Sequence, residues 1–255
     1  MEDADEKRVQ VVGAIKSLGR NCVNDCTTKR TLLAAIARLF DPLGLIAPVI
    51  IIGKLILKEV TFVKVANSEG VQVSLNWDSL VPAALLERWR AFRSDLPGIE
   101  DIAVSRWTEY DPASVAFVQL HAFCNGSSST YAASVYLRVE HVNETVDTTL
   151  LAAKAKVTSV KPLTIPMTKL SGAVLAVKLV RWLSTVVQIG GVPVETFFWT
   201  DATIVLHWLT GDVQWWKTFV ANRVGFILDH SDPSQWRHLG TEEKPSGLRD
   251  QRIGT

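Results

Sequence analysis

The chain has 255 residues, which is enough for one large domain or two modest ones. Hydrophobic residues make up 47% of it and charged residues 21%, a balance that is typical of packed globular proteins and excludes wholesale disorder. The net charge of +1 gives no electrostatic footprint for nucleic acid. Three cysteines (Cys22, Cys26 and Cys124) do not make a disulfide framework in a chain of this size, so reduced thiols are the default interpretation.

No segment of the sequence indicates secretion or membrane insertion. Residues 1–6 are acidic and polar, unlike a signal peptide. The most apolar run, residues 42–52, is shorter than the roughly 20 residues that a membrane span needs. We therefore expect an intracellular protein, cytoplasmic or nuclear, with no membrane partner.

The first part of the chain predicts a small helical segment. Apolar residues recur at helical spacing over residues 28–40, 47–63 and 82–92. Asp41-Pro42-Leu43-Gly44 breaks the first helix, because proline disfavours helical geometry before it and glycine permits a turn. Residues 66–81 are polar, and we expect them to be irregular. A change of pattern places a domain boundary near residue 110.

Beyond that boundary the pattern predicts a mixed α/β domain. In chain order we expect strands over 115–124, 131–139 and 149–157, a helix over 166–187, a strand over 195–200, helices over 201–210 and 217–228, and a short strand over 235–239. The order is βββ-α-β-α-α-β, with one crossover helix between the third and fourth strands. This order predicts a five-stranded mixed sheet with flanking helices.

A single carboxylate, Asp201, follows the aromatic strand at residues 195–200. In mixed α/β domains such a residue lies at the edge of the sheet, where ligands and metals collect. By itself, a strand-end Asp is more often a helix N-cap than a catalytic residue. The function of Asp201 therefore depends on the residues that surround it.

Several motifs follow one another through nearly the whole chain from residue 28 onward. They are Thr28-Lys29-Arg30, Ile36-Ala37-Arg38-Leu39-Phe40-Asp41-Pro42-Leu43-Gly44-Leu45-Ile46-Ala47-Pro48, Leu75-Asn76-Trp77-Asp78, Gln119-Leu120-His121-Ala122-Phe123-Cys124, Leu151-Ala152-Ala153-Lys154, Leu163-Thr164-Ile165-Pro166, Trp199-Thr200-Asp201, Trp216-Lys217-Thr218-Phe219-Val220-Ala221-Asn222-Arg223-Val224 and Trp236-Arg237-His238. In this order they resemble the Pao retrotransposon peptidase region of Bel/Pao-type retrotransposon polyproteins. The resemblance implies a helical reverse-transcriptase tail or connection segment over residues 1–110 and a ribonuclease H-like domain over residues 111–255.

The resemblance also implies where a metal site once lay. Ribonuclease H cleavage uses two divalent ions, Mg²⁺ in the family, to clamp the scissile phosphate and activate a water, and hard ions need several oxygen ligands. Carried over to this chain, the family's four carboxylates fall on Asn125, Lys169, Asp201 and Gly247. Asp201 is the only acid retained, so it is the only candidate catalytic residue and metal ligand.

These replacements predict a degenerate site. Asn125 offers a neutral carbonyl, Gly247 has no side chain, and Lys169 brings a positive charge into a cation pocket. We expect two-metal cleavage to be lost and no cofactor to be bound. The Lys169 ammonium is expected either to pair with Asp201, in place of the metal, or to reach solvent.

The leading hypothesis is a retrotransposon-derived polyprotein fragment that is catalytically inactive and serves as a structural or binding module. The alternatives are a nucleic-acid-binding module for RNA–DNA hybrids and a weakly active ribonuclease H that supports reverse transcription. The expected partners are such a hybrid or the rest of the polyprotein, and no small-molecule substrate. A cluster on one face would favour binding if it combined the cations Lys154, Lys156, Lys161, Lys217 and Arg223.

Other chemistries have little support in the sequence. No Asp-Ser-Gly or Asp-Thr-Gly marks an aspartic protease, and no Tyr-x-Asp-Asp marks a polymerase palm. Ser127-Ser128-Ser129 and His121 are the one possible hydrolase pairing, and a polar turn is the preferred interpretation of the serines.

Overall fold

The computed structural model describes residues 8–10, 27–39, 41–66, 69–99, 103–105, 112–159, 163–186 and 192–240. The chain divides into two compact units, Met1–Thr108 and Glu109–Thr255. The division falls beside residue 110, where the hydrophobic pattern of the sequence changes. Gly247 and Lys161 lie outside the described residues.

The first unit is mostly helical, as the sequence predicts. Its helices are α2 (Lys29–Ala37), α3 (Ala47–Phe62) and α4 (Ala83–Asp95). Helix α2 begins with a capping box, in which Thr28 and Thr31 each accept a hydrogen bond from the backbone amide of the other. The three helices share one buried cluster that includes Leu32, Ile36, Ile50, Ile56, Val60, Trp89 and Phe92.

Two short two-stranded sheets complete this unit. Strand β1 (Arg8–Gln10) pairs with β4 (Ala103–Ser105), and β2 (Lys64–Ala66) pairs with β3 (Gln72–Ser74), both antiparallel. The expectation that residues 66–81 are irregular is therefore wrong for β3. Three-residue strands are too short for alternation to stand out from a polar loop, so their pairing is not visible in the sequence.

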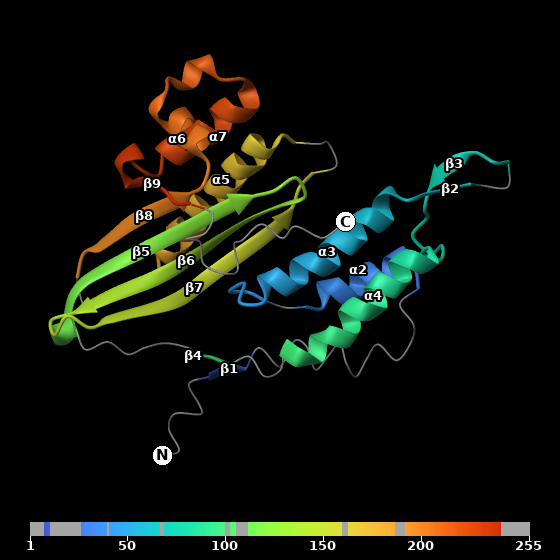
Figure 1. Cartoon of the computed structure of the whole chain (residues 1–255), viewed down its shortest axis with the longest axis horizontal. Helices are drawn as coiled ribbons and strands as arrows, with labels where there is room; N and C mark the ends of the chain where they lie inside the picture. Colours follow the sequence, from blue (N-terminus) through green and yellow to red (C-terminus); the bar gives the residue numbers. More distant parts are fainter. Residues whose placement is uncertain are drawn as a thin grey trace. The chain divides into compact units, whose positions relative to one another are not determined.

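The second unit contains the predicted five-stranded mixed sheet (Figure 1). Its strands are β5 (Val115–Gly126), β6 (Thr130–His141), β7 (Val146–Val157), β8 (Val194–Thr200) and β9 (Trp236–His238). The order across the sheet is β7-β6-β5-β8-β9, and β6 is antiparallel to both of its neighbours, β5 and β7. Strand β8 runs parallel to β5, and β9 runs parallel to β8.

Helices α5 (Ile165–Leu183), α6 (Thr203–Thr210) and α7 (Thr218–Leu228) pack together beside this sheet (Figure 1). Helix α5 is the crossover between β7 and β8, and it contacts β5 and β6 most extensively. Alternate residues of β5, namely Val118, Leu120, Ala122 and Cys124, are buried in the cluster that the helices share with the sheet. None of the helices that the structure describes is long and apolar enough to cross a membrane.

Candidate functional site

The edge of the sheet at which β5 and β8 end carries two of the predicted site residues. The two strands are parallel neighbours, and their last paired residues are Cys124 and Thr200. Asn125 directly follows Cys124, and Asp201 directly follows Thr200. Because both strands end in the same direction, Asn125 and Asp201 lie at the same edge.

Two glycines allow helix α5 to approach this edge very closely. A Cβ atom on Gly126, at the end of β5, would lie 2.7 Å from the backbone nitrogen of Lys169. A Cβ atom on Gly172, in α5, would lie 2.7 Å from the carbonyl oxygen of Asn125. Only residues without a Cβ allow the strand and the helix to meet at these distances. The contact sets Lys169 directly beside the end of β5.

The Lys169 ammonium forms an ion pair with the Asp201 carboxylate, with 2.7 Å between Nζ and Oδ2. The Asp201 side chain is only 5% exposed, and that of Lys169 is 18% exposed. Of the two alternatives that the sequence left open for the Lys169 ammonium, the structure shows the ion pair with Asp201. A nearly buried carboxylate needs such a partner, because an uncompensated charge in this position is costly.

Asn125 is buried, and its side-chain oxygen is already engaged. Its Oδ1 atom accepts a hydrogen bond of 2.8 Å from the backbone amide of Gly126. The structure thus brings together three of the four positions that the resemblance assigns to the site, Asn125, Lys169 and Asp201. The fourth, Gly247, lies outside the described residues.

The residues at this edge do not fit a hard divalent ion. Such ions take several oxygen ligands, mostly carboxylates and carbonyls. Within the described ranges, no group of three or more His, Cys, Asp or Glu residues is arranged to hold a metal. Among the described residues, Asp201 is the carboxylate at this edge. It has an ammonium group at hydrogen-bond distance, and that positive charge repels a cation.

The strand order, the crossover helix and the strand-end acid together define a ribonuclease H-like α/β domain. The chain belongs to the family described as Pao retrotransposon-like RNaseH-like domain, whose model matches residues 28–202. No curated protein sequence matches the chain.

Three solved structures illustrate the similarity. The foamy viral protease-reverse transcriptase in complex with double-stranded DNA is 15% identical, with a TM-score of 0.46, over 91% of this chain and 35% of that one. RNase H1 from the archaeon Halobacterium salinarum NRC-1 is 17% identical, with a TM-score of 0.30, over 51% of this chain and 93% of that one. The N-terminal RNase H domain of rv2228c from Mycobacterium tuberculosis, fused to maltose-binding protein, is 16% identical, with a TM-score of 0.28, over 50% of this chain and 80% of that one. The chain spans about a third of the length of the foamy viral protein.

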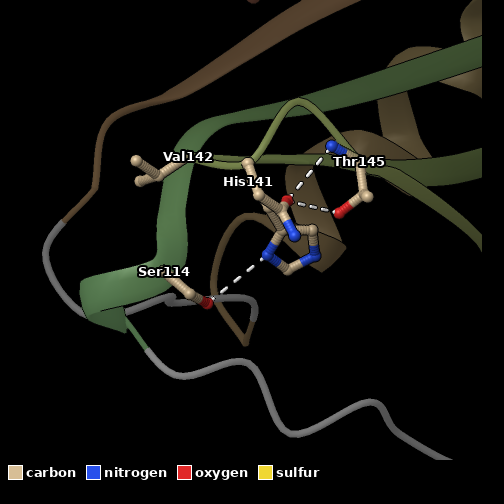
Figure 2. A pocket seen from close by; sticks show the side chains of 5 residues that line it. Ser114, His141, Val142 and Thr145 are labelled. Carbon is tan, nitrogen blue, oxygen red and sulfur yellow. Dashed lines mark hydrogen bonds between the residues drawn. The ribbon is translucent and has the colours of Figure 1, made fainter.

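A separate pocket of about 500 Å³ lies at the opposite end of the sheet (Figure 2). There the His141 ring lies between Ser114 and Asp147, with 3.4 Å from Nδ1 to the Ser114 hydroxyl and 2.9 Å from Nε2 to the carboxylate. The arrangement is reminiscent of a hydrolytic triad, but the serine contact is too long for a strong hydrogen bond. The nearby amides of Val142 and Thr145 already donate to other groups, so they are not available to stabilise an oxyanion. We interpret the cluster as a structural contact that joins the start of β5 to the end of β6 and the start of β7.

The serines and histidine noted in the sequence do not pair. Ser127 bonds to Thr130 within the turn between β5 and β6, which supports the polar-turn interpretation. His121 instead accepts a hydrogen bond of 3.0 Å from the indole of Trp199 and lies 3.2 Å from the Gln119 side-chain oxygen. The close-approach glycines were the site features that sequence reasoning missed. A glycine within a strand and another within a helix were the available signals.

Proposed function

We propose that this chain is a retrotransposon-derived polyprotein fragment whose ribonuclease H-like domain does not perform two-metal cleavage. The domain keeps the sheet, the crossover helix and the strand-end Asp201 of the fold. It serves as a structural or nucleic-acid-binding module, in association with the rest of a polyprotein or with an RNA–DNA hybrid.

The ion pair between Lys169 and Asp201 carries this proposal. In the family, the position of Lys169 holds a carboxylate that helps to bind the ions. A lysine there replaces one negative charge by one positive charge, and its ammonium already neutralises the remaining acid. The ion pair therefore does for Asp201 what a metal ion does in an active relative, namely compensate its charge, without supplying an activated water.

A cleavage assay tests the proposal. Purified full-length chain is incubated with an RNA–DNA hybrid labelled on its RNA strand, over a titration of Mg²⁺ and of Mn²⁺, beside the Asp201→Asn variant. We expect both proteins to leave the hybrid intact. Metal-dependent cleavage by the parent protein that Asp201→Asn abolishes would show instead that the chain is a weakly active ribonuclease H.

A second experiment tests whether Asn125 and Lys169 are the residues that prevent metal binding. The double variant Asn125→Asp/Lys169→Glu places two carboxylates beside Asp201 and removes the ammonium. We expect it to bind Mn²⁺ in a calorimetric titration, whereas the parent protein does not. A matched variant, Lys178→Glu, makes the same charge change as Lys169→Glu but further along α5, and it is expected to leave Mn²⁺ binding unchanged.

Nucleic-acid binding is favoured by a separate observation, the distribution of charge along the sheet. Three lysines lie at the end of the sheet where β5 and β8 terminate, namely Lys154, Lys156 and Lys169. Among the described residues of the strands and of α5, the acid at this end is Asp201, which follows β8. The opposite end of the strands carries the acids Glu140, Asp147 and Glu195. A polyanion would therefore approach the site end. Fluorescence anisotropy with a labelled hybrid, over a range of salt concentrations, measures such binding.

A further inference from the structure

Helices α5, α6 and α7 cover one face of the five-stranded sheet. Leu120, Phe198 and Trp236 point to these helices, because they belong to the same buried cluster as residues of α5, α6 and α7. Side chains alternate between the two faces of a strand, so the next residues along each strand point to the opposite face. The aromatic members of that opposite face, which we call the aromatic face, are His121, Phe123, Tyr136, Phe197 and Trp199.

These five side chains form a continuous row across the neighbouring strands β6, β5 and β8. The His121 ring stacks on Phe197 and on Trp199, with ring centroids 5.4 Å and 6.0 Å apart. The Phe123 ring stacks on Trp199 at 6.1 Å and meets Tyr136 edge-on at 5.7 Å. All five residues are partly exposed, and none of them belongs to the buried cluster. A contiguous aromatic surface of this kind is typical of an interaction site.

The charged residues of the aromatic face suit a protein partner. They are two arginines and two glutamates, namely Arg138, Glu140, Glu195 and Arg237. The lysines of the described strands, Lys154 and Lys156, lie opposite Ala133 and Tyr131 and therefore point to the helix side. Protein interfaces are enriched in aromatic residues and arginine and depleted in lysine. The balanced charges and the aromatic row thus match the composition of a protein–protein interface.

Two of these charges lie on either side of the aromatic row along the strand direction. Arg237 in β9 pairs with Trp199, and its guanidinium lies 5.7 Å from the centroid of the Phe197 ring. Glu195 precedes Phe197 by two residues in β8, whereas Trp199 follows it by two. Arg237 and Glu195 are both exposed. Among the described residues, neither of them takes part in an ion pair.

This placement makes the aromatic face complementary to itself. A two-fold axis that crosses the strands at the level of Phe197 brings two copies of the face together with their strands antiparallel. Arg237 of each copy then faces Glu195 of the other copy, so that two ion pairs form around the aromatic rows. Packed sheets lie about 10 Å apart, a distance that the long arginine and glutamate side chains can span from both sides.

The size of the face is close to what a stable pair needs. Strands β5, β6 and β7 contain 12 residues each, β8 contains 7 and β9 contains 3. With about 3.3 Å per residue and about 4.8 Å between strands, one face of the sheet covers roughly 700 Å². A standard protein interface buries about 800 Å² on each partner.

We propose that the chain forms a two-fold symmetric dimer through the aromatic face, with Arg237 of each copy paired with Glu195 of the other. The aromatic row supplies the apolar centre of the contact. The two ion pairs at its rim fix the antiparallel orientation of the copies. The contact does not involve the ion pair at Asp201, so it goes beyond the function proposed above and does not depend on it.

Sedimentation equilibrium of the full chain over a range of concentrations tests this contact. We expect a reversible equilibrium between monomer and dimer. Arg237→Glu and Glu195→Arg each place like charges at both rim contacts, so each should weaken dimerisation about tenfold. An equimolar mixture of these two variants restores both ion pairs between unlike copies, so mixed dimers should form about as tightly as dimers of the parent protein.

Two controls separate this contact from general effects of charge. Arg181→Glu makes the same charge change on the exposed side of α5, which covers the other face of the sheet, and should dimerise like the parent. A mixture of Arg181→Glu with Glu195→Arg has the same difference in net charge but keeps one contact between like charges. It should therefore associate more weakly than the mixture of Arg237→Glu with Glu195→Arg.

Three results would overturn the proposal. One is a monomer at every concentration, whether another part of the chain or a different protein covers the aromatic face. A second is a dimer that Arg237→Glu and Glu195→Arg weaken no more than Arg181→Glu does, which would place the contact elsewhere. The third is a mixture of Arg237→Glu with Glu195→Arg that associates no more tightly than either variant alone. Circular dichroism checks that each variant is folded; if Arg237→Glu is not, the comparison of Glu195→Arg with Arg181→Glu decides.

Discussion

Removing the positive charge of Lys169 should destabilise the second unit, because it leaves the Asp201 carboxylate nearly buried without its partner. Lys169→Met keeps the length of the side chain and a similar helix propensity, so the variant changes mainly the charge. At the observed 2.7 Å, Coulomb's law gives roughly 6 kcal/mol of gross attraction at an effective dielectric constant of about 20. Desolvation offsets part of this attraction.

Loss of one partner from a buried ion pair typically costs about 3–5 kcal/mol. The Lys169 side chain is 18% exposed, so this ion pair is not completely buried. We therefore expect the low end of that range, about 3 kcal/mol. The double variant Lys169→Met/Asp201→Asn removes both charges and should recover most of this loss, since no uncompensated charge remains.

Urea denaturation of the full chain, followed by circular dichroism and tryptophan fluorescence, measures these differences as shifts of the transition midpoint. Lys178→Met serves as the control, because Lys178 is an exposed lysine of the same helix; its effect should stay below about 1 kcal/mol. The reasoning is refuted if Lys169→Met unfolds at the same urea concentration as the parent. It is equally refuted if adding Asp201→Asn to Lys169→Met destabilises the protein further.

Two further predictions concern packing and pH. Gly225→Ala in α7 should stabilise the protein by about 1 kcal/mol, because a Cβ atom there has no neighbour within 4 Å. Gly172→Ala in α5 should instead destabilise it by about 1–3 kcal/mol, since its Cβ atom would lie 2.7 Å from the Asn125 carbonyl oxygen; equal midpoint shifts for the two variants would contradict the close approach. Burial, and next the charge of Arg138, lower the pKa of His121 below its usual value of 6.5. Its neutral form is therefore favoured by folding, and the stability that it contributes should be complete above pH 6.5 and decrease as the pH falls below that value. Urea midpoints measured at several pH values should fall less below pH 6.5 in His121→Gln than in the parent protein. An identical pH dependence in the two proteins would refute this contribution of His121.

The sequence by itself determined the order and type of the main elements in both units. Helical spacing of apolar residues located α2, α3, α4 and α5, and buried apolar runs located β5 to β8, because burial of one face is a local, periodic requirement. Family motifs identified the edge at Asp201. The pairing of β2 with β3 was missed, since three residues carry too little periodicity to predict a strand.

Only the tertiary structure decided where the Lys169 ammonium lies. Whether its ammonium reaches Asp201 or water depends on how far α5 lies from the end of β8, and a sequence contains no such distance. Gly126 and Gly172 set the approach of α5 to the neighbouring strand β5 by the absence of a Cβ atom, and their effect is visible only when strand and helix are placed together.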